Sequence, residues 1–403
     1  MDFVDLKYEP LETDLVCTFH VEPNGIDIKE AAGAVAAESS VGTWTELTTT
    51  KTVNRLAARV FSIINNEAKV AYSEELFEEG NMPNVLSSIA GNVFGLRTIK
   101  NLKLLDLDLP SDLISRFMGP RFGIEGIRKI LKIPKRPLVG TIIKPKLGLK
   151  TADHATVAYE AWVGGCDIVK DDENLSSQRF NPFEERVTKT LELRDKAQNE
   201  TGERKVYMAN VTAETKKMLK RAEFIVEHGG EYAMVDILTC GFSALQTLRE
   251  QNLPIVIHAH RAGHAAFTKN PKHGISMRAI AKVARAIGVD QIHVGTVVGK
   301  MSETKHEVLE NINALKIPMH GLKRVLPVAS GGLHPRLVPA LMKTFGTDVV
   351  IQAGGGIHGH KNGTVAGAKA MRQAVDGALK GEPIEEYSRN HRELRIALEL
   401  WKN

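Results

Sequence analysis

The sequence predicts an α/β protein with an N-terminal α+β domain, a (β/α)₈ TIM barrel and a short helical C-terminal tail. Eight short apolar runs, rich in β-branched residues, occur through the C-terminal two thirds of the 403-residue chain. Longer helical patterns separate most of these runs, and this alternation predicts a parallel sheet that is covered on both faces. Eight such units are typical of a closed barrel. The first 130 residues lack the alternation, which predicts a separate domain of another class.

The N-terminal domain is expected at residues 1–130 and ends near the proline-containing stretch LKIPKRP (131–137). The segment RVFSIINNEAKVAYS predicts two paired strands around a polar turn at Asn65 and Asn66. LVCTFHVEP predicts another strand, and two further segments predict helices. The strand segments lie at residues 15–23 and 59–73, and the helix segments at 27–40 and 83–91.

The barrel domain is expected at residues 131–380, and the helical tail at residues 381–403. The eight predicted strands lie at residues 137–144, 166–170, 205–211, 232–237, 254–260, 291–295, 325–330 and 348–354. Plausible helices between them lie at residues 151–163, 212–228, 242–251, 274–287, 302–314 and 335–344.

The composition narrows the class of protein. Apolar residues make up 43% of the chain and charged residues 25%, which is ordinary for a globular protein. No apolar run is long enough to span a membrane, and the start MDFVDLKYEP does not resemble a signal peptide. Cys17, Cys166 and Cys240 lie far apart, which indicates a reduced, cytoplasmic setting. The formal charge is only +5, and the absence of a dense basic block argues against nucleic acid as a partner.

Charged residues and glycines gather at the ends of the predicted strands. Barrel enzymes place their chemistry at the carboxyl ends of their strands, so these residues are expected to share one face. Any one group has a simple structural explanation, but their occurrence together predicts an active site. The strand-end groups are KPK (144–146), KDDE (170–173), HAHRAGH (258–264), HVGTVVGK (293–300), SGG (330–332) and QAGGG (352–356).

KDDE combines a lysine with hard oxygen ligands. Lys170 and Asp172 share one side of the strand, and Glu173 follows where the strand ends. The two carboxylates suit Mg²⁺, whereas a protonated lysine would repel the cation. A lysine that has reacted with CO₂ is instead an anionic carbamate and supplies a third ligand. Taken alone, KDDE is more typical of an exposed Lys–Asp ion pair.

Two further groups suit proton transfer and anion binding. Lys144 and Lys146 point to the same side of their strand, and two close amines depress each other's pKa. One amine then suits proton transfer and the other anion binding, although a solvated lysine pair is an equal alternative. His260 and Arg261 can supply a proton carrier and a phosphate-binding fork. A lone histidine is more often a core residue, but three histidines in seven positions weaken that alternative.

The glycine clusters indicate phosphate binding. Glycines after the seventh and eighth strands can present backbone N–H groups where barrels often hold a phosphate. The motif GGGIHG (354–359) also matches G-x-G-x-x-G, but no second strand with a ribose-binding acid follows, which excludes a dinucleotide fold. GTVVGK (295–300) lacks Walker spacing, and its glycines suit a mobile lid that brings Lys300 over the substrate.

Taken together, the motifs closely resemble the large subunit of ribulose-1,5-bisphosphate carboxylase/oxygenase, RuBisCO, over nearly the whole chain. The matching segments stand in family order. They are AAESSVGTWT (36–45), EELFEEG (74–80), IAGNVFG (89–95), IKPKLGL (143–149), GGCDIVKDDEN (164–174), HAHRAGHA (258–265), GTVVGK (295–300), ASGG (329–332) and QAGGG (352–356).

The resemblance implies carboxylation of ribulose-1,5-bisphosphate with CO₂ and water to two 3-phosphoglycerate molecules, with competing oxygenation. Lys170 resembles the carbamylated lysine, which with Asp172 and Glu173 binds Mg²⁺. Its carbamate, formed from an activator CO₂, is then the base that removes the C3 proton to give the enediol. The resemblance makes Lys144 and His260 further acid–base residues, and it makes Lys300 the residue that orients CO₂.

The resemblance also implies a substrate-binding set. Arg261 and His293 hold one phosphate, glycines with Thr43 and Trp44 hold the other, and Ser330 binds a hydroxyl. The N-terminal members complete the barrel site of a neighbouring subunit, so the active unit is a homodimer or a ring of dimers. The set comprises Glu38, Thr43, Trp44, Asn92, Lys146, Arg261, His293, Ser330, Gly331, Gly332, Gln352, Gly354 and Gly355.

The short tail and the segment GTIIKPK (140–146) are most similar to those of the form III, archaeal-type members. These act without small subunits and consume ribulose bisphosphate made from nucleoside monophosphates. Ile142, Met301 and Ala353 depart from common family residues, which bears on the form and not on the catalytic set. One alternative is a RuBisCO-like enolase or isomerase of a methylthio-sugar phosphate. Another is a non-catalytic barrel that binds a sugar phosphate.

Overall fold

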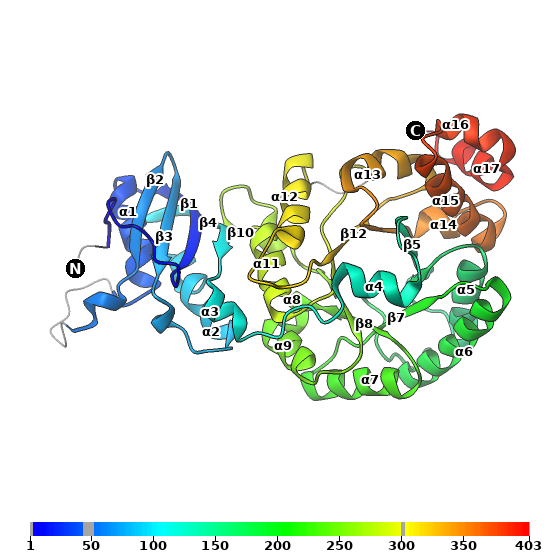
Figure 1. Cartoon of the computed structure of the whole chain (residues 1–403), viewed down its shortest axis with the longest axis horizontal. Coiled ribbons are helices and arrows are strands. Elements are labelled where there is room, and N and C mark those ends of the chain that lie inside the picture. The colour runs from blue at the N-terminus through cyan, green and yellow to red at the C-terminus, as the bar shows by residue number, and fades with distance from the viewer. Residues whose placement is uncertain (1–2, 43–51, 300–302, 403) are drawn as a thin grey trace. The chain divides into compact units, whose positions relative to one another are not determined.

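A computed structural model describes residues 3–42, 52–299 and 303–402, and the chain forms two compact units (Figure 1). Each unit is assembled from segments that are distant in sequence. The domain limits expected near residues 130 and 380 remain predictions. The first unit comprises Met1–Gly119, Gly263–Ile287 and Pro318–Leu322, and the second comprises Pro120–Ala262, Gly288–Ile317 and Lys323–Asn403.

The first unit contains a five-stranded sheet in the order β10-β4-β1-β3-β2. All neighbouring strands are antiparallel except β10 and β4, which are parallel. The predicted strand at residues 15–23 and the predicted strand pair at 59–73 are confirmed, whereas β4 was not expected. The strands are β1 (Leu15–Pro23), β2 (Arg59–Ile64), β3 (Glu67–Tyr72), β4 (Ile99–Asp108) and β10 (Gly274–Ile275).

The alternation of β1 explains how this sheet forms its core. Leu15, Cys17, Phe19 and Val21 are all 0% exposed, while the residues between them are partly exposed. One face of the strand is therefore buried, and α1 (Ile28–Glu38) lies against β1 and β2. The other helices of this unit are α2 (Met82–Ile89), α3 (Ser111–Ser115), α10 (Ala265–Thr268) and α11 (Met277–Ile287), with 3₁₀ turns η1 (Thr52–Leu56), η2 (Glu74–Leu76) and η3 (Asn92–Gly95).

The second unit is a closed parallel barrel in the strand order β11-β12-β13-β5-β6-β7-β8-β9. All eight predicted barrel strands are confirmed, and the fold class is the one that the sequence predicts. The strands are β5 (Leu138–Ile142), β6 (Ile168–Lys170), β7 (Val206–Asn210), β8 (Tyr232–Asp236), β9 (Val256–His260), β11 (Gln291–His293), β12 (Leu326–Ser330) and β13 (Val350–Gln352).

Helices surround the barrel, and they include the helical C-terminal tail, α16 and α17 (Figure 1). The predicted helix at 151–163 coincides with α5, whereas the long helix α6 was not predicted. The helices are α4 (Gly123–Leu131), α5 (Thr151–Val163), α6 (Phe183–Thr201), α7 (Thr215–Glu227), α8 (Ile237–Cys240), α9 (Phe242–Glu250), α12 (Lys305–Lys316), α13 (Val338–Phe345), α14 (Gly355–His358), α15 (Gly363–Leu379), α16 (Ile384–Tyr387) and α17 (Arg392–Leu400), with 3₁₀ turns η4 (Pro335–Leu337) and η5 (Ser388–Asn390).

Helix α4 closes the amino-terminal end of the barrel. Ile124, Ile127 and Leu131 pack in one buried cluster with residues of the barrel strands. The buried carboxylate of Asp290 anchors the start of this helix, because it accepts hydrogen bonds from the backbone N–H groups of Phe122 (2.6 Å) and Gly123 (3.0 Å). The closed end leaves the opposite, carboxyl-terminal face for chemistry.

None of the described helices is long and apolar enough to cross a membrane.

Candidate active site

The candidate site is built at the carboxyl ends of the barrel strands. Five of the residues predicted from the sequence are the last residues of their strands, so parallel pairing brings them to one face. They are Lys170 on β6, His260 on β9, His293 on β11, Ser330 on β12 and Gln352 on β13. The structure therefore gathers side chains that lie more than 180 residues apart in the sequence at one end of the barrel.

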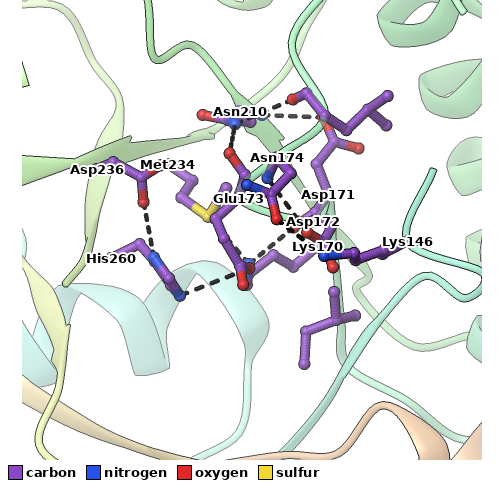
Figure 2. Close-up of polar contacts among 12 residues, drawn as sticks. Lys146, Lys170, Asp171, Asp172, Glu173, Asn174, Asn210, Met234, Asp236 and His260 are labelled. Carbon is purple, nitrogen blue, oxygen red and sulfur yellow. Dashed lines mark hydrogen bonds and ion pairs between the residues drawn. The ribbon is translucent and has the colours of Figure 1, made fainter. Parts of the chain in front are cut away.

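Lys170 is buried among the carboxylates of this face (Figure 2), with only 1% of its surface exposed. Its Nζ donates to the backbone oxygen of Asp171 at 2.8 Å and lies 3.1 Å from the Sδ of Met234. Glu173 Oε2 is more distant, at 3.5 Å. Burial lowers the pKa of Lys170, although the nearby carboxylates oppose this. Burial therefore makes the neutral amine, which is the form that reacts with CO₂, easier to reach than in an exposed lysine.

Asp172 and its neighbours connect the loop to the first barrel strand. Lys144 Nζ donates to Asp172 Oδ2 at 2.7 Å, and the carboxylate of Asp172 is 2% exposed. Lys146 Nζ lies 3.3 Å from Asn174 Oδ1 in a more exposed position. Each lysine thus has a different partner instead of facing the other. Asp172 is neutralised by a side chain that extends from the end of another strand, and a ligand could take the place of that side chain.

Glu173 and His260 form the other side of the site (Figure 2). His260 Nδ1 lies 2.7 Å from Asp236 Oδ1, and its Nε2 lies 3.6 Å from Glu173 Oε2. Although burial acts in the opposite direction, the charges of Lys170 and His260 lower the pKa of Glu173 to about 2. Glu173 is therefore an ionised carboxylate. The bond to Asp236 orients the imidazole so that its second nitrogen faces the site.

Asp171 points away from the site and fixes the loop that carries its neighbours. Its carboxylate accepts hydrogen bonds from Tyr207 Oη (2.6 Å), from Arg186 Nε (3.2 Å) and from the backbone N–H of Asn210 (3.0 Å). Asn210 Nδ2 also donates to the backbone oxygen of Glu173 at 3.0 Å. These bonds hold Asp172 and Glu173 in place without using their carboxylates.

Arg261 and His293 lie on a neighbouring part of the same face. Arg261 forms an ion pair with Glu303, and both side chains are largely buried. The second terminal nitrogen of Arg261, Nη1, is buried without a hydrogen-bond partner among the described residues. His293 packs edge-on against His260, with ring centroids 4.8 Å apart. An anion at this position would meet a buried donor that is not yet satisfied.

The predicted glycine clusters follow β12 and β13. Ser330 and Gln352 are partners in the parallel register, so the two glycine turns begin side by side. Gly331 and Gly332 have φ of +122° and +71°, a conformation that favours glycine. A Cβ added at Gly354 would lie 3.0 Å from Lys144 Cε, so this backbone passes close to the lysine. Both polar side-chain atoms of Gln352 are buried without a partner within the described residues, and Gly355 opens α14.

Two predicted residues lie in the first unit, and three cannot be placed on this face. Glu38 ends α1 and Asn92 begins η3, and both belong to the first unit. Thr43, Trp44 and Lys300 lie outside the described residues.

Several residues that shape the site were not predicted from the sequence. Asp236 is the last residue of β8, and Asn210 is the last residue of β7, so the rule that drew attention to other strand ends could have identified both. His258 was grouped with His260 but was given no role. Asp171 was read only as part of KDDE. Met234 gave no signal, because a methionine inside a strand is typical of the core.

The residues present fit a divalent cation. The described residues contain no group of three His, Cys, Asp or Glu side chains that could hold a metal ion. Asp172 and Glu173 supply two hard carboxylates, and the adjacent Lys170 is buried, which lowers its pKa. The two carboxylates alone provide too few anionic ligands for Mg²⁺. A carbamate on Lys170 would add a third anionic oxygen ligand.

The fold and the site define a class: a (β/α)₈-barrel protein with a lysine- and carboxylate-rich catalytic face. Two family models cover almost the whole chain. The model "Ribulose bisphosphate carboxylase large chain, catalytic domain" matches residues 123–401, and the corresponding N-terminal domain model matches residues 2–113. The chain belongs to the ribulose bisphosphate carboxylase large-chain family.

Relatives and solved structures agree with this family. The chain is 50% identical to "Ribulose bisphosphate carboxylase" of Methanocaldococcus jannaschii over 100% of both chains. It is 49% identical to the protein of that name from Methanosarcina mazei over 99% of both. The octameric Rubisco of Pyrococcus horikoshii, crystallised with sulfate ion, superimposes with a TM-score of 0.96 at 48% identity and covers 99% of this chain and 96% of its own. A dimeric archaeal Rubisco from Hyperthermus butylicus gives a TM-score of 0.92 at 46% identity, with 99% and 98% covered.

Proposed function

We propose that this chain catalyses carboxylation of ribulose-1,5-bisphosphate, in which CO₂ and water yield two molecules of 3-phosphoglycerate. Oxygenation of the same substrate, a monooxygenase reaction, would compete. The observation that carries the proposal is the buried Lys170, which lies 3.5 Å from Glu173 and directly before Asp171 and Asp172 at the carboxyl end of a closed barrel. Full-length relatives at about half identity that are named for this carboxylase support it, and they do not favour the enolase or isomerase alternative.

We propose that Lys170, as its carbamate with an activator CO₂, holds Mg²⁺ together with Asp172 and Glu173. When bound, the cation and the carbamate supply charge stabilisation at the reacting carbons and a base. The protein prepares this group by burying the amine beside a thioether and a backbone oxygen, and burial lowers the pKa of the amine. The ammonium of Lys144 donates a hydrogen bond to Asp172 in this structure. It would leave that carboxylate when the cation binds.

Proton transfer at the reacting carbons of the substrate is assigned to Lys144 and His260. The side chain of Lys144 lies at the edge of the site and is about one third exposed, so its amine can reach both substrate and water. His260 is held by Asp236 at Nδ1, which leaves Nε2 for proton transfer on the substrate side. Lys300 is assigned to CO₂ and to the new carboxylate, and Lys146 to support of Lys144 and the metal site.

The two phosphates are assigned to separate places on the same face. Arg261 and His293 would bind one phosphate, and the unsatisfied Nη1 of Arg261 supports this assignment. Glycine backbone N–H groups would bind the other phosphate. Ser330 would bind a substrate hydroxyl, and Gln352 belongs to the same substrate-binding set. For this second phosphate the proposed set is Thr43, Trp44, Gly331, Gly332, Gly354 and Gly355.

The active unit is proposed to be a homodimer or a ring of dimers without a small subunit. Solved relatives that are dimeric and octameric support an assembly of this kind. Glu38 and Asn92 would complete the barrel site of a neighbouring subunit. A cytoplasmic location, and a role in the metabolism of nucleoside monophosphates and ribose bisphosphate, are proposed from the similarity to the archaeal members.

The first experiment is fixation of labelled CO₂. The protein is incubated with bicarbonate and Mg²⁺, ribulose-1,5-bisphosphate is added without oxygen, and labelled 3-phosphoglycerate is measured. Product that depends on both the preincubation and the metal is expected, and Lys170→Ala should remove it while the fold remains. If the folded, oligomeric protein gives no product, carboxylation is refuted and methylthio-sugar phosphates become the next substrates.

A further inference from the structure

Three side chains inside the barrel form a hydrogen-bonded chain that ends at the proposed phosphate site. Gln291 and His293 lie on the same side of β11, and Gln291 is paired in register with His258 on β9. Gln291 Nε2 lies 2.9 Å from His258 Nδ1, and His258 Nε2 lies 3.0 Å from His293 Nε2. Gln291 and His258 are 0% exposed and His293 is 6% exposed, so solvent water does not compete for these bonds.

Both imidazoles in this chain are neutral. Burial is the largest cause that lowers the pKa of His258 and of His293 well below the ordinary value, and nearby positive charge acts in the same direction. A neutral imidazole carries one proton and therefore donates at one nitrogen and accepts at the other. Since the two Nε2 atoms face each other, one of them is protonated and the other is not. The direction of this one bond determines which nitrogen of His293 donates.

The amide of Gln291 sets that direction. Its Nε2 lies 3.6 Å from the Sδ of Met208 as well as 2.9 Å from His258. A thioether sulfur has no proton to donate, so the amide end that faces Met208 is the NH₂ group and not the carbonyl oxygen. The same NH₂ group then donates to His258 Nδ1. His258 must carry its proton on Nε2 and donate to His293 Nε2, which leaves the proton of His293 on Nδ1.

We infer that Gln291 is a positioning residue that fixes the tautomers of His258 and His293, so that His293 presents an N–H donor at Nδ1 to a substrate phosphate. The identity of the anion rests on the proposed function. Nδ1 of His293 has no hydrogen-bond partner within the described ranges, and neither has the buried Nη1 of Arg261. The reverse tautomer would direct a lone pair at the phosphate. The glutamine therefore acts on the substrate through two imidazoles and does not touch the substrate itself.

The proton positions can be read without any assay of activity. Protein with ¹⁵N-labelled histidine is examined by ¹⁵N–¹H spectroscopy of the ring nitrogens, with assignment by single His→Gln variants. His258 protonated at Nε2 and His293 protonated at Nδ1 are expected near neutral pH. A proton on Nε2 of His293 in the unmodified protein would overturn the inference.

The variant Gln291→Met removes the amide but keeps the length of the side chain. The two directions of the His258–His293 bond then become about equally populated, because neither Nδ1 atom retains a protein partner. Only half of the molecules hold the donor form, so KM for ribulose-1,5-bisphosphate should rise about twofold while kcat is unchanged. A variant that keeps the tautomers of the unmodified protein would refute the role of Gln291.

Asn311→Leu is the matched control. Asn311 is also a buried amide, and its Nδ2 donates to the backbone oxygen of Val294, next to His293. Among the described residues no hydrogen bond joins Asn311 to either imidazole. Loss of packing in this region without a change in the tautomers should therefore leave the ring-nitrogen signals unchanged. Unmodified protein that shows the expected tautomers but fixes no CO₂ would refute the proposed function alone. Protein that fixes CO₂ with His293 protonated at Nε2 would refute the tautomer assignment alone.

Discussion

Arg186→Leu is expected to destabilise the barrel and to displace the loop that carries Lys170. Arg186 and Asp171 are both 0% exposed and form an ion pair at 3.2 Å. Removing one partner of a buried pair leaves an uncompensated charge and costs about 3–5 kcal/mol. Arg186 also donates to the backbone oxygens of Asn181 (2.8 Å) and Ser176 (2.7 Å), so the expected loss lies near the upper end of that range.

A milder variant keeps the effect measurable if Arg186→Leu does not fold. Tyr207→Phe removes a single hydrogen bond of 2.6 Å to the same carboxylate. A hydrogen bond to a charged group contributes roughly 1.5–3 kcal/mol, which sets the expected loss. In both variants the activity of the folded fraction should fall, because Asp171 lies between two residues of the proposed metal site.

The assay is urea unfolding at a fixed protein concentration, applied to Arg186→Leu, Asp171→Asn and the double variant. The double variant should cost less than the sum of the single variants by about 2 kcal/mol, because each single change strands the other partner. Lys189→Met on the same helix is the control, since its pair with Glu192 is exposed and should contribute under about 1 kcal/mol. Additive losses from the two single variants would refute the reasoning.

The pH dependence gives a second check. Burial alone would raise the pKa of Asp171, but the charge of Arg186 holds it well below the usual range. This contribution to stability is fully present above the unfolded pKa of about 3.9 and is lost as the pH falls through the folded value. The stability difference between the unmodified protein and Arg186→Leu should therefore narrow below about pH 4.

Three other outcomes are expected. Asp290→Ala should lower the free energy of unfolding by about 3–5 kcal/mol, because it strands the buried Arg249 (2.7 Å), while KM of the folded protein is unchanged. Burial lowers the pKa of His358 to about 4, so stability should fall by roughly 3 kcal/mol as the pH drops from 6.5 to 4, and His358→Gln should remove that slope in urea titrations. Mixing inactive Glu38→Gln chains with inactive Lys170→Ala chains should restore some CO₂ fixation, and no recovery after confirmed subunit exchange would contradict shared sites.

The barrel strands could be predicted from sequence because they are continuous apolar runs, a pattern that requires no knowledge of partners. Strand β4 could not, because buried polar side chains interrupt it. Lys103 is 5% exposed and reaches the backbone oxygens of Thr268 (2.9 Å) and Asn270 (2.6 Å), which lie far along the chain. Helix α6 was missed for a similar reason, since its buried face includes Arg186 and Arg194. Elements that bury charged residues can be predicted only when the partners of those residues are known.

In the site, too, some features follow from local sequence patterns and others depend on residues that are distant in the sequence. Strand-end position drew attention to Lys170, His260 and His293, because parallel strands end at one face, and the family resemblance supplied their expected roles. The hydrogen bonds that orient them depend on register and rotamer. The pairing of Gln291 with His258, for instance, follows from the alignment of β11 with β9, which no local pattern encodes.

The partners of the acidic side chains separate structural from chemical roles in this barrel. Asp171 and Asp290 are neutralised by arginines and backbone N–H groups, which cannot leave without unfolding the surrounding structure. Asp172 is instead paired with the flexible Lys144, and Glu173 meets Lys170 and His260 only at 3.5 and 3.6 Å. These two carboxylates can exchange their partners for a cation at little structural cost. Adjacent acids in KDDE therefore differ in role because of the donors that the fold brings to each, and not because of their chemistry.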